Sequence, residues 1–164
     1  METAMSYGSY DWEPYTVITE DGWFLSLFHI TGVKGESRPS EDFKDKPPIL
    51  LMHGGGGSAM GEVEGGTPGG LAERGYDVWV GNNRGARYSD KNRRDGEWSE
   101  KERMNWSWAE MGIYDVPAFI DKVLEVTGKP KVTLIGYSMG TAQIYYGLAK
   151  KQDYFAERVN RYVA

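Results

Sequence analysis

One serine stands in a pattern that could make it a nucleophile. Ser138 lies in Gly136-Tyr137-Ser138-Met139-Gly140, a G-x-S-x-G sequence between a buried apolar run and a helical segment. In that context the serine sits on a sharp turn from strand to helix, and Gly136 and Gly140 let the strand and the helix approach closely. The N-terminus of the helix directs N–H groups and the positive end of its dipole at the site. The pattern could arise by chance in a chain with 22 glycines, but its position between a strand and a helix favours a nucleophile.

A run of four glycines could serve the same chemistry. His53-Gly54-Gly55-Gly56-Gly57 follows the apolar run Ile49–Met52. A glycine loop can turn backbone N–H groups inward, where they stabilise the oxyanion of an acyl-transfer reaction. We expect the N–H groups of Met139 and Gly55 to form this oxyanion hole. The alternatives are a flexible loop or a phosphate cradle, but a Walker-type loop would need Gly-Lys-Ser/Thr at its end, which is missing here.

The sequence favours neither of its two histidines as the base for this serine. His53 ends the strand that leads into the glycine loop, so we interpret it as a structural hydrogen-bonding residue. His29 lies in a predicted hairpin far along the sheet and is interpreted as a surface or edge residue. No histidine follows Ser138. Asp153 and Glu157 fall within or just beyond the helix that begins there, where we expect surface residues rather than members of a catalytic triad.

One arginine and three tryptophans each have two interpretations. Arg84, in Asn83-Arg84-Gly85, follows the strand after the glycine loop. Its guanidinium could bind an anionic substrate, but we favour a structural role in which it ties loops together through backbone carbonyls. Trp98, Trp106 and Trp108 could line an acyl pocket, although core packing is the preferred interpretation.

The elements that must position these residues alternate between strands and helices after an N-terminal hairpin. Asp21-Gly22 between two apolar runs predicts the hairpin, and Ser107-Trp108-Ala109-Glu110 has the spacing of a capping box that begins a helix. Pro117 would kink or restart that helix, and Gly128 ends it. The predicted strands are 15–19, 23–30, 49–52, 76–80, 132–135 and 159–164, the predicted helices are 71–74, 107–127 and 138–151, and 31–46 is a predicted loop.

This order predicts an α/β fold. The apolar runs have the continuous pattern of strands buried on both faces of a parallel sheet. Alternation with helices predicts a mostly parallel sheet that has helices on both faces and an N-terminal antiparallel hairpin.

The composition excludes several classes of protein. A net charge of −5 argues against a nucleic-acid-binding protein, which needs a basic surface. The absence of cysteine excludes disulfides, thiolate metal sites and a thiol nucleophile. No apolar run approaches the length of about 18 residues that a membrane span needs. The first five residues have neither the basic nor the apolar region of a secretory signal peptide.

Several segments together resemble the acid lipase family of α/β-hydrolases, which includes gastric lipase, lysosomal acid lipase and the yeast steryl ester hydrolases. The matches are in order from about Tyr10 onward, and the Gly81-Asn82-x-Arg84-Gly85 piece is especially specific. The matching segments are Tyr15–Gly22, Leu51–Gly54, Gly75–Asn82, Tyr114–Ala118 and Gly136–Thr141.

The resemblance implies hydrolysis of neutral lipid esters, either triacylglycerols or sterol esters, without a cofactor or metal. It implies Ser138 as the nucleophile and Gly55 and Met139 as the oxyanion donors, and it suggests a secreted or lysosomal protein. The family usually has a bulky residue where Gly55 stands, and it has fewer glycines between positions 56 and 70. It also places its catalytic Asp and His well after the nucleophile and a cap domain after the strand predicted at 159–164.

These differences leave three explanations open. We favour a fragment of a full lipase, whose missing C-terminal segment supplies the Asp, the His and the cap. A second polypeptide could supply them instead, or the chain could be a structural or interaction subunit without catalysis. We therefore expect residues 1–164 to form a single, incomplete α/β-hydrolase domain. Its uncovered sheet edge and apolar faces would require more chain or a partner.

Overall fold

A single mixed sheet forms the centre of the molecule. The structure is a computed structural model that describes residues 5–7, 10–35, 47–59, 61, 66–92 and 99–164. Within these residues the strand order is β1-β2-β3-β5-β4-β7-β8, and β6 pairs with β3. The strands are β1 (Met5–Tyr7), β2 (Tyr10–Ile18), β3 (Trp23–Val33), β4 (Ile49–Met52), β5 (Val78–Gly81), β6 (Lys91–Asn92), β7 (Val132–Gly136) and β8 (Val159–Val163).

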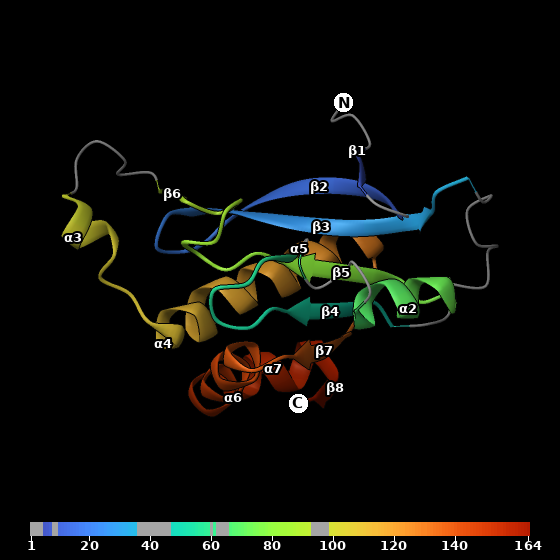
Figure 1. The fold of residues 1–164 in the computed structure, drawn as a ribbon. Coiled ribbons are helices and arrows are strands. Elements are labelled where there is room, and N and C mark those ends of the chain that lie inside the picture. Colours follow the sequence, from blue (N-terminus) through green and yellow to red (C-terminus); the bar gives the residue numbers. More distant parts are fainter. Residues whose placement is uncertain (1–4, 8–9, 36–46, 60, 62–65, 93–98) are drawn as a thin grey trace.

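The sheet has an antiparallel part and a parallel part, as the sequence predicts. Strands β1, β2 and β3 pair antiparallel with one another, and β3 also pairs antiparallel with β5. Strands β5, β4, β7 and β8 run parallel to one another. The carboxyl ends of the parallel strands therefore meet at one edge of the sheet, at the left of Figure 1.

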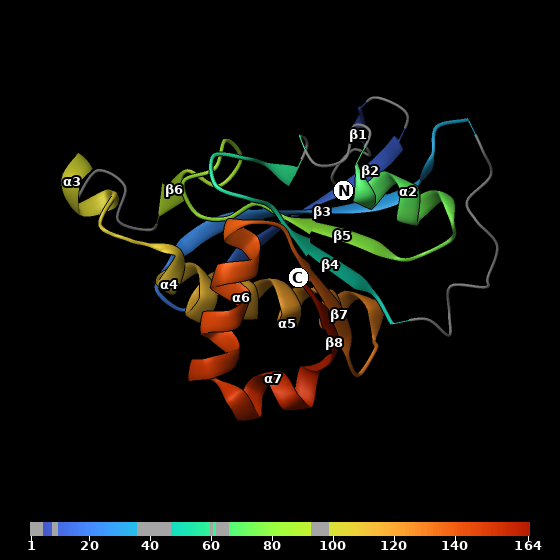
Figure 2. The ribbon, with the colours of Figure 1, turned by 60° about the horizontal axis from the view of Figure 1, so that its bottom comes forward.

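Helices cover both faces of this sheet. On one face α2 (Thr67–Glu73) packs its Ala72 against a cluster that includes Leu51 and Val80. On the other face α5 (Val116–Thr127), α6 (Met139–Lys150) and α7 (Gln152–Arg158) pack against a cluster that includes Leu50 and Trp79. Figure 2 shows the two groups of helices apart. Because side chains alternate along a strand, Leu50 and Leu51 contribute to different cores. The α/β fold with helices on both faces is confirmed.

The hairpin is longer than the sequence predicts. Strand β2 begins at Tyr10 rather than Tyr15, and β3 continues to Val33, past the predicted end at Ile30. The turn is closed by Thr19, whose hydroxyl accepts the backbone N–H of Trp23 at 2.8 Å. Residues 36–46 of the predicted loop lie outside the described residues.

The helix predicted to begin at Ser107 does so through a capping box. Ser107 accepts the N–H of Ala109 through its hydroxyl at 3.1 Å, and Glu110 accepts the N–H of Ser107 at 2.7 Å. A short segment, α4 (Trp108–Glu110), then opens into a π-helical turn, η2 (Met111–Asp115), before α5 restarts the α-helix. Pro117 lies in the first turn of α5, which is the restart that the sequence predicts, and Gly128 ends the helix in the left-handed conformation.

The remaining short elements differ in their bounds. Helix α2 begins at Thr67, before the predicted start at Leu71, and α3 (Glu100–Arg103) forms where the sequence predicts neither a helix nor a strand. The predicted helix 138–151 ends at Lys150 and is followed directly by α7.

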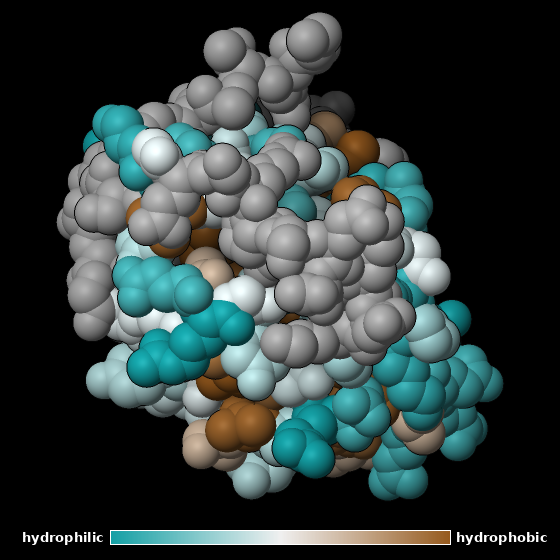
Figure 3. Space-filling model, turned by 90° about the vertical axis from the view of Figure 1, so that its right-hand side faces the viewer, coloured by the Kyte–Doolittle hydropathy of each residue, from teal (hydrophilic) through white to brown (hydrophobic). Residues whose placement is uncertain are grey.

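Figure 3 shows the molecule from the amino ends of the parallel strands, where the coloured atoms are mostly hydrophilic.

Candidate active site

The turn that carries Ser138 has the strained backbone of a nucleophile elbow. Ser138 lies between the last residue of β7 and the first residue of α6, at φ 51° and ψ −114°. It is the one non-glycine residue with a positive φ among the described residues. Such a conformation costs roughly 1–3 kcal/mol and is held by the surrounding structure, often at functional sites. The side chain of Ser138 is exposed at the carboxyl edge of the sheet.

The two glycines that flank the serine are required by close backbone contacts. A Cβ on Gly140 would collide with the carbonyl oxygen of Met52 and lie 2.9 Å from that of His53. A Cβ on Gly136 would lie 2.8 Å from the backbone of Thr141. The strand and the helix thus cross with no room for a side chain at either position, as the G-x-S-x-G spacing requires.

The glycine loop after β4 lies against the elbow. A Cβ on Gly54 would lie 3.3 Å from Cβ of Ser138, and a Cβ on Gly55 would lie 3.7 Å from Sδ of Met139. Met139 is the first residue of α6, and the first N–H groups of a helix have no partner within it. The two segments that carry the predicted oxyanion donors are therefore neighbours. Their role as donors stays a prediction.

His53 is buried beneath this loop and is engaged through both ring nitrogens. Nε2 accepts the backbone N–H of Asn83 at 3.1 Å, and Nδ1 lies 2.8 Å from the carbonyl oxygen of Gly54. Only 3% of the residue is exposed. These contacts are those of a structural hydrogen-bonding residue, and they occupy the nitrogens that a catalytic base would need.

His29 lies far from the elbow on strand β3. Its Nε2 is 2.7 Å from Asp77 Oδ1, and its ring stacks on Trp79 at 4.0 Å between centroids. Strand β3 pairs on both sides, so the expectation of an edge residue is wrong, and the residue is half-buried. Neither histidine of this sequence is thus placed to activate Ser138. Asp153 and Glu157 are exposed on α7.

Arg84 is buried at the centre of a charged network. Its Nε and Nη2 donate to Oδ1 of Asp115 at 2.9 and 2.7 Å, and its backbone N–H donates to Oδ2 at 2.9 Å. On the other side, Nη1 and Nη2 donate to the carboxylate of Asp21 at 2.6 and 2.9 Å. The expected partners were backbone carbonyls, and the observed ones are carboxylates. A fixed, buried guanidinium needs anionic partners, because carbonyl dipoles alone do not balance its charge.

This network joins three segments that surround the site. It ties the turn of the hairpin at Asp21 to the loop after β5 and to the end of η2 at Asp115. Burial raises the pKa of Asp115 to about 6, although the positive charge of Arg84 opposes that rise. From the sequence, Asp21 is predicted only as part of a turn, and Asp115 has no predicted role. The sequence signal for both carboxylates was Arg84, because a buried arginine needs acidic partners to neutralise its charge.

Comparisons with known proteins agree with this geometry. A family model described as the alpha/beta hydrolase fold matches residues 47–164, which is more than half of the chain. The chain belongs to the α/β-hydrolase fold family. A second model, described as a partial alpha/beta-hydrolase lipase region, matches residues 1–59.

Known proteins that are similar to this chain in sequence include several lipases. It is 35% identical to Lipase lipl-3 of Caenorhabditis elegans over 92% of the chain and 37% of that protein. It is 38% identical to Lipase 1 of Drosophila melanogaster over 90% of the chain and 32% of that protein. It is 34% identical to gastric triacylglycerol lipase of Mus musculus over 98% of the chain and 40% of that protein. The resemblance to lipases is confirmed, and the chain spans two fifths or less of the length of these relatives.

Solved structures agree on the fold. An esterase of Pyrococcus furiosus superimposes with a TM-score of 0.60 at 17% identity, over 93% of this chain and 53% of that one. A putative aryl esterase of Burkholderia cenocepacia gives a TM-score of 0.56 at 24% identity, over 92% and 46%.

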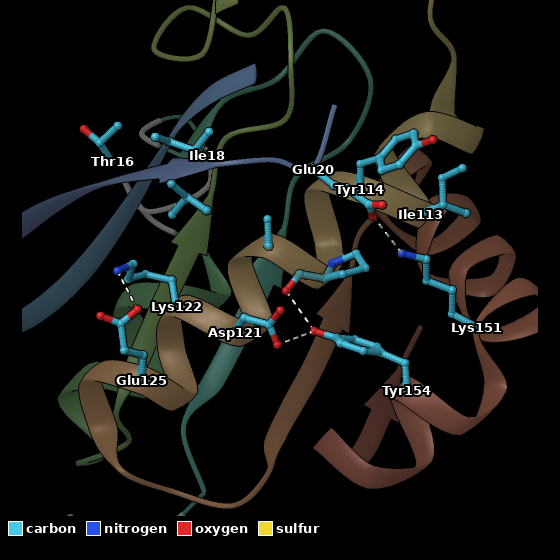
Figure 4. Close-up of a pocket in the computed structure, with 13 residues that line it drawn as sticks. Thr16, Ile18, Glu20, Ile113, Tyr114, Asp121, Lys122, Glu125, Lys151 and Tyr154 are labelled. Atoms are coloured by element: carbon cyan, nitrogen blue, oxygen red, sulfur yellow. Dashed lines mark hydrogen bonds and ion pairs between the residues drawn. The ribbon is translucent and has the colours of Figure 1, made fainter. Parts of the chain in front are cut away.

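Of the pockets lined by described residues, two have volumes above 400 Å³, and one of these adjoins the elbow. The first, of about 460 Å³, is lined by residues that include Met139, His53, Asn83, Trp106 and Met111. The second, of about 570 Å³, lies between strand β2, helix α5 and the start of α7, and it is lined by no residue of the elbow or the glycine loop. Figure 4 shows this second pocket, where Tyr154 donates to Asp121 and Lys151 faces Glu20. The pocket beside Met139 is the candidate substrate site.

The three tryptophans differ in their surroundings. Trp106 packs edge to face against Trp23 of the core and also lines the pocket beside the elbow. Core packing and pocket lining, the two interpretations of this residue, therefore both apply. Trp108 is 45% exposed, so core packing is wrong for this residue. Trp98 lies outside the described residues.

No helix among the described residues is long and apolar enough to cross a membrane.

Proposed function

We propose that Ser138 is the nucleophile of a lipase that cleaves neutral lipid esters, either triacylglycerols or sterol esters, through an acyl-enzyme. The observation that carries the proposal is the strained backbone of Ser138, at φ 51°, beside the glycine loop. The lipase relatives support the same reaction.

The proposed reaction begins when Ser138 Oγ attacks the ester carbonyl and loses its proton to a base. The N–H groups of Gly55 and Met139 stabilise the oxyanion, each with an effect of about 2.7–4 kcal/mol in related sites. The alcohol then leaves with a proton, and water hydrolyses the acyl-serine in a second, similar step. Since His29 and His53 are both engaged elsewhere, the base is a histidine from outside these 164 residues. We propose that a further segment of the same polypeptide, or a second chain, supplies it.

A fluorophosphonate probe tests this proposal on the full-length protein. We expect covalent labelling at Ser138, located by peptide mass spectrometry. Ser138→Ala should abolish labelling and lower esterase turnover by a factor on the order of 10⁶. Ser107→Ala serves as the control, since Ser107 is an exposed helix cap, and labelling should persist. A folded full-length protein that takes up no label would refute the proposal and would favour a non-catalytic subunit.

A further inference from the structure

The pocket beside the elbow is lined by a cation and by buried polar groups that have no partner. Arg87 lines it, and the guanidinium of this exposed residue lies 5.6 Å from the ring centroid of Tyr88. No described carboxylate forms an ion pair with Arg87. Asn83 is 1% exposed, and neither its amide oxygen nor its amide nitrogen has a hydrogen-bond partner. The indole N–H of Trp106 is also buried and unpartnered.

Unpartnered buried groups are costly, so their presence at one pocket requires a reason. A buried donor or acceptor without a partner costs about 1–3 kcal/mol. The neighbouring residue shows what the fold does when it satisfies an amide. Asn82 is fully buried, and its side chain accepts the N–H of Ala59 at 2.9 Å and donates to the carbonyl of Ser26 at 3.0 Å. The amide of Asn83, one residue later, makes no such bond.

The charges around this pocket favour an anion. No acidic residue is among the described residues that line it. Its other arginine, Arg84, is already neutralised by Asp21 and Asp115. Both ring nitrogens of His53 are engaged by backbone groups. Among the described residues that line the pocket, the positive charge left for a ligand is therefore that of Arg87.

The second pocket has no such excess of positive charge. Nζ of Lys122 lies 2.7 Å from the carboxylate of Glu125, and Nζ of Lys151 lies 3.8 Å from that of Glu20 (Figure 4). Each lysine thus has an acidic neighbour that lines the same pocket, so an anion would meet carboxylates there. Of these two pockets, the one beside the elbow is the one whose charge selects an anion.

A carboxylate fits the groups of the pocket beside the elbow. The donors are the guanidinium, the buried amide and indole N–H groups, and the hydroxyl of Ser58, which also lines the pocket. The side-chain acceptors are the amide oxygen and that hydroxyl, so donors outnumber acceptors. Hydrogen bonds from a cation to a carboxylate are the stronger kind. The single charge of Arg87 matches a monoanion better than a phosphate monoester, which carries about −1.5 to −2 at neutral pH.

We propose that Arg87, Asn83 and Trp106 form a subsite for a carboxylate, separate from the oxyanion hole at Gly55 and Met139. The carboxylate has two possible sources. It is either a second acid group on the ester substrate or the free fatty acid that ester hydrolysis releases. The first source rests on the proposed function and extends it from neutral to acidic esters, whereas binding of a fatty acid does not require the nucleophile.

A matched pair of esters tests the first source in the full-length protein. Monoethyl succinate and ethyl 4-oxopentanoate have the same chain, and they differ in that one carboxylate oxygen of the former is a methyl group in the latter. The ratio of kcat/KM for the acidic ester to kcat/KM for the neutral ester measures the subsite. Arg87→Gln should lower this ratio about tenfold, because it removes hydrogen bonds between charged groups. Arg87→Lys keeps the charge and should retain part of the ratio.

A binding measurement tests the second source. In full-length Ser138→Ala, octanoate should shift the indole N–H resonance of Trp106, and the neutral octanamide should bind at least about tenfold more weakly. Arg87→Gln in the same background should raise the Kd of octanoate about tenfold. Arg87 is exposed, so this substitution leaves the core intact.

Arg74→Gln supplies the matched control. Arg74 is also exposed, donates to the carbonyl of Gly70 at the end of α2, and does not line the pocket. It should change neither the ester ratio nor the Kd of octanoate.

The outcomes separate the two sources and the two proposals. An effect of Arg87→Gln on the ester ratio identifies an acidic substrate, and an effect on octanoate alone identifies a fatty acid. If Arg87→Gln changes neither quantity, or if Arg74→Gln changes them equally, the subsite is overturned. Because octanoate binding is measured in Ser138→Ala, it tests the subsite even if fluorophosphonate leaves Ser138 unlabelled, a result that would refute the proposed function alone.

Discussion

The ring of His53 accepts the backbone N–H of Asn83 through Nε2 at 3.1 Å. A nitrogen that accepts a hydrogen bond carries no proton, so the neutral ring is protonated at Nδ1 and donates to the carbonyl of Gly54 at 2.8 Å. That carbonyl and the N–H of Gly55 belong to the same planar peptide. His53 therefore fixes the direction of the proposed oxyanion donor, and Asn83 fixes the tautomer of His53.

The first prediction concerns His53 as a positioning residue. His53→Leu should lower kcat of the full-length protein about 10- to 100-fold, because loss of one oxyanion donor costs 10²- to 10³-fold and a displaced donor costs less. KM should change little, since the oxyanion forms in the transition state. His53→Gln, whose side-chain oxygen can still accept the N–H of Asn83, should recover part of kcat. A purely structural role would instead lower the melting temperature of His53→Leu without this split between kcat and KM.

A second prediction compares two glycines at the site. Gly140→Ala should prevent correct folding, because the new Cβ would collide with the Met52 carbonyl. Gly55→Ala should fold and keep its melting temperature, since its Cβ would lie 3.7 Å from Met139, an ordinary contact distance. Thermal unfolding of both full-length variants tests this difference. A Gly140→Ala protein as stable as the wild type would show that the strand and helix do not cross this closely.

The third prediction follows from the buried charges of Arg84 and Asp115. Arg84→Met leaves the fully buried carboxylate of Asp115 without its cation, which should cost about 3–5 kcal/mol of unfolding free energy. Burial already raises the pKa of Asp115 from 3.8 to about 6 in the folded protein, and removal of the arginine raises it further. Ionisation of Asp115 then opposes folding, so the variant should lose more stability as the pH rises above about 6.

Urea unfolding at pH 5 and pH 8 measures this effect. The difference between Arg84→Met and the wild type should be larger at pH 8. Lys122→Met provides the control because Lys122 forms only a partly exposed pair with Glu125. It should change stability by at most about 0.5 kcal/mol at either pH. Equal destabilisation of Arg84→Met at both pH values would contradict the role given to Asp115.

A fourth prediction concerns the capping box before the π-helical turn. Ser107→Ala removes the hydroxyl that accepts the N–H of Ala109 and should cost about 1 kcal/mol. The hydrogen bond from the Ser107 hydroxyl also lowers the pKa of Glu110, so this pKa should rise in the variant. Because the pKa of Glu110 is lowered in the folded wild-type protein, the ionised carboxylate stabilises the fold at neutral pH. This stabilisation is lost as the pH falls through that lowered pKa. An NMR titration of Glu110 in both proteins checks the shift, and Ser107→Thr should retain it.

The sequence by itself determined the order of the elements and the position of the candidate nucleophile. These depend on local rules: apolar runs form buried strands, Ser107 and Glu110 cap a helix, and glycines two residues on either side of Ser138 allow a tight turn. Such rules act between residues that are close in the chain, so they apply without knowledge of the tertiary structure. The predicted bounds of β2 and α2 were less accurate, because the ends of these elements are set by pairing and packing with distant segments.

Only the tertiary structure decided which residues from distant segments meet. Arg84 binds Asp21 and Asp115, which lie 63 and 31 residues away, and local sequence rules contain no information about such pairs. The same holds for His53 and Asn83, which are 30 residues apart and meet because β4 and β5 are neighbours in the sheet. Whether an amide is satisfied, as in Asn82, or unpartnered, as in Asn83, depends on the atoms that the fold brings around it.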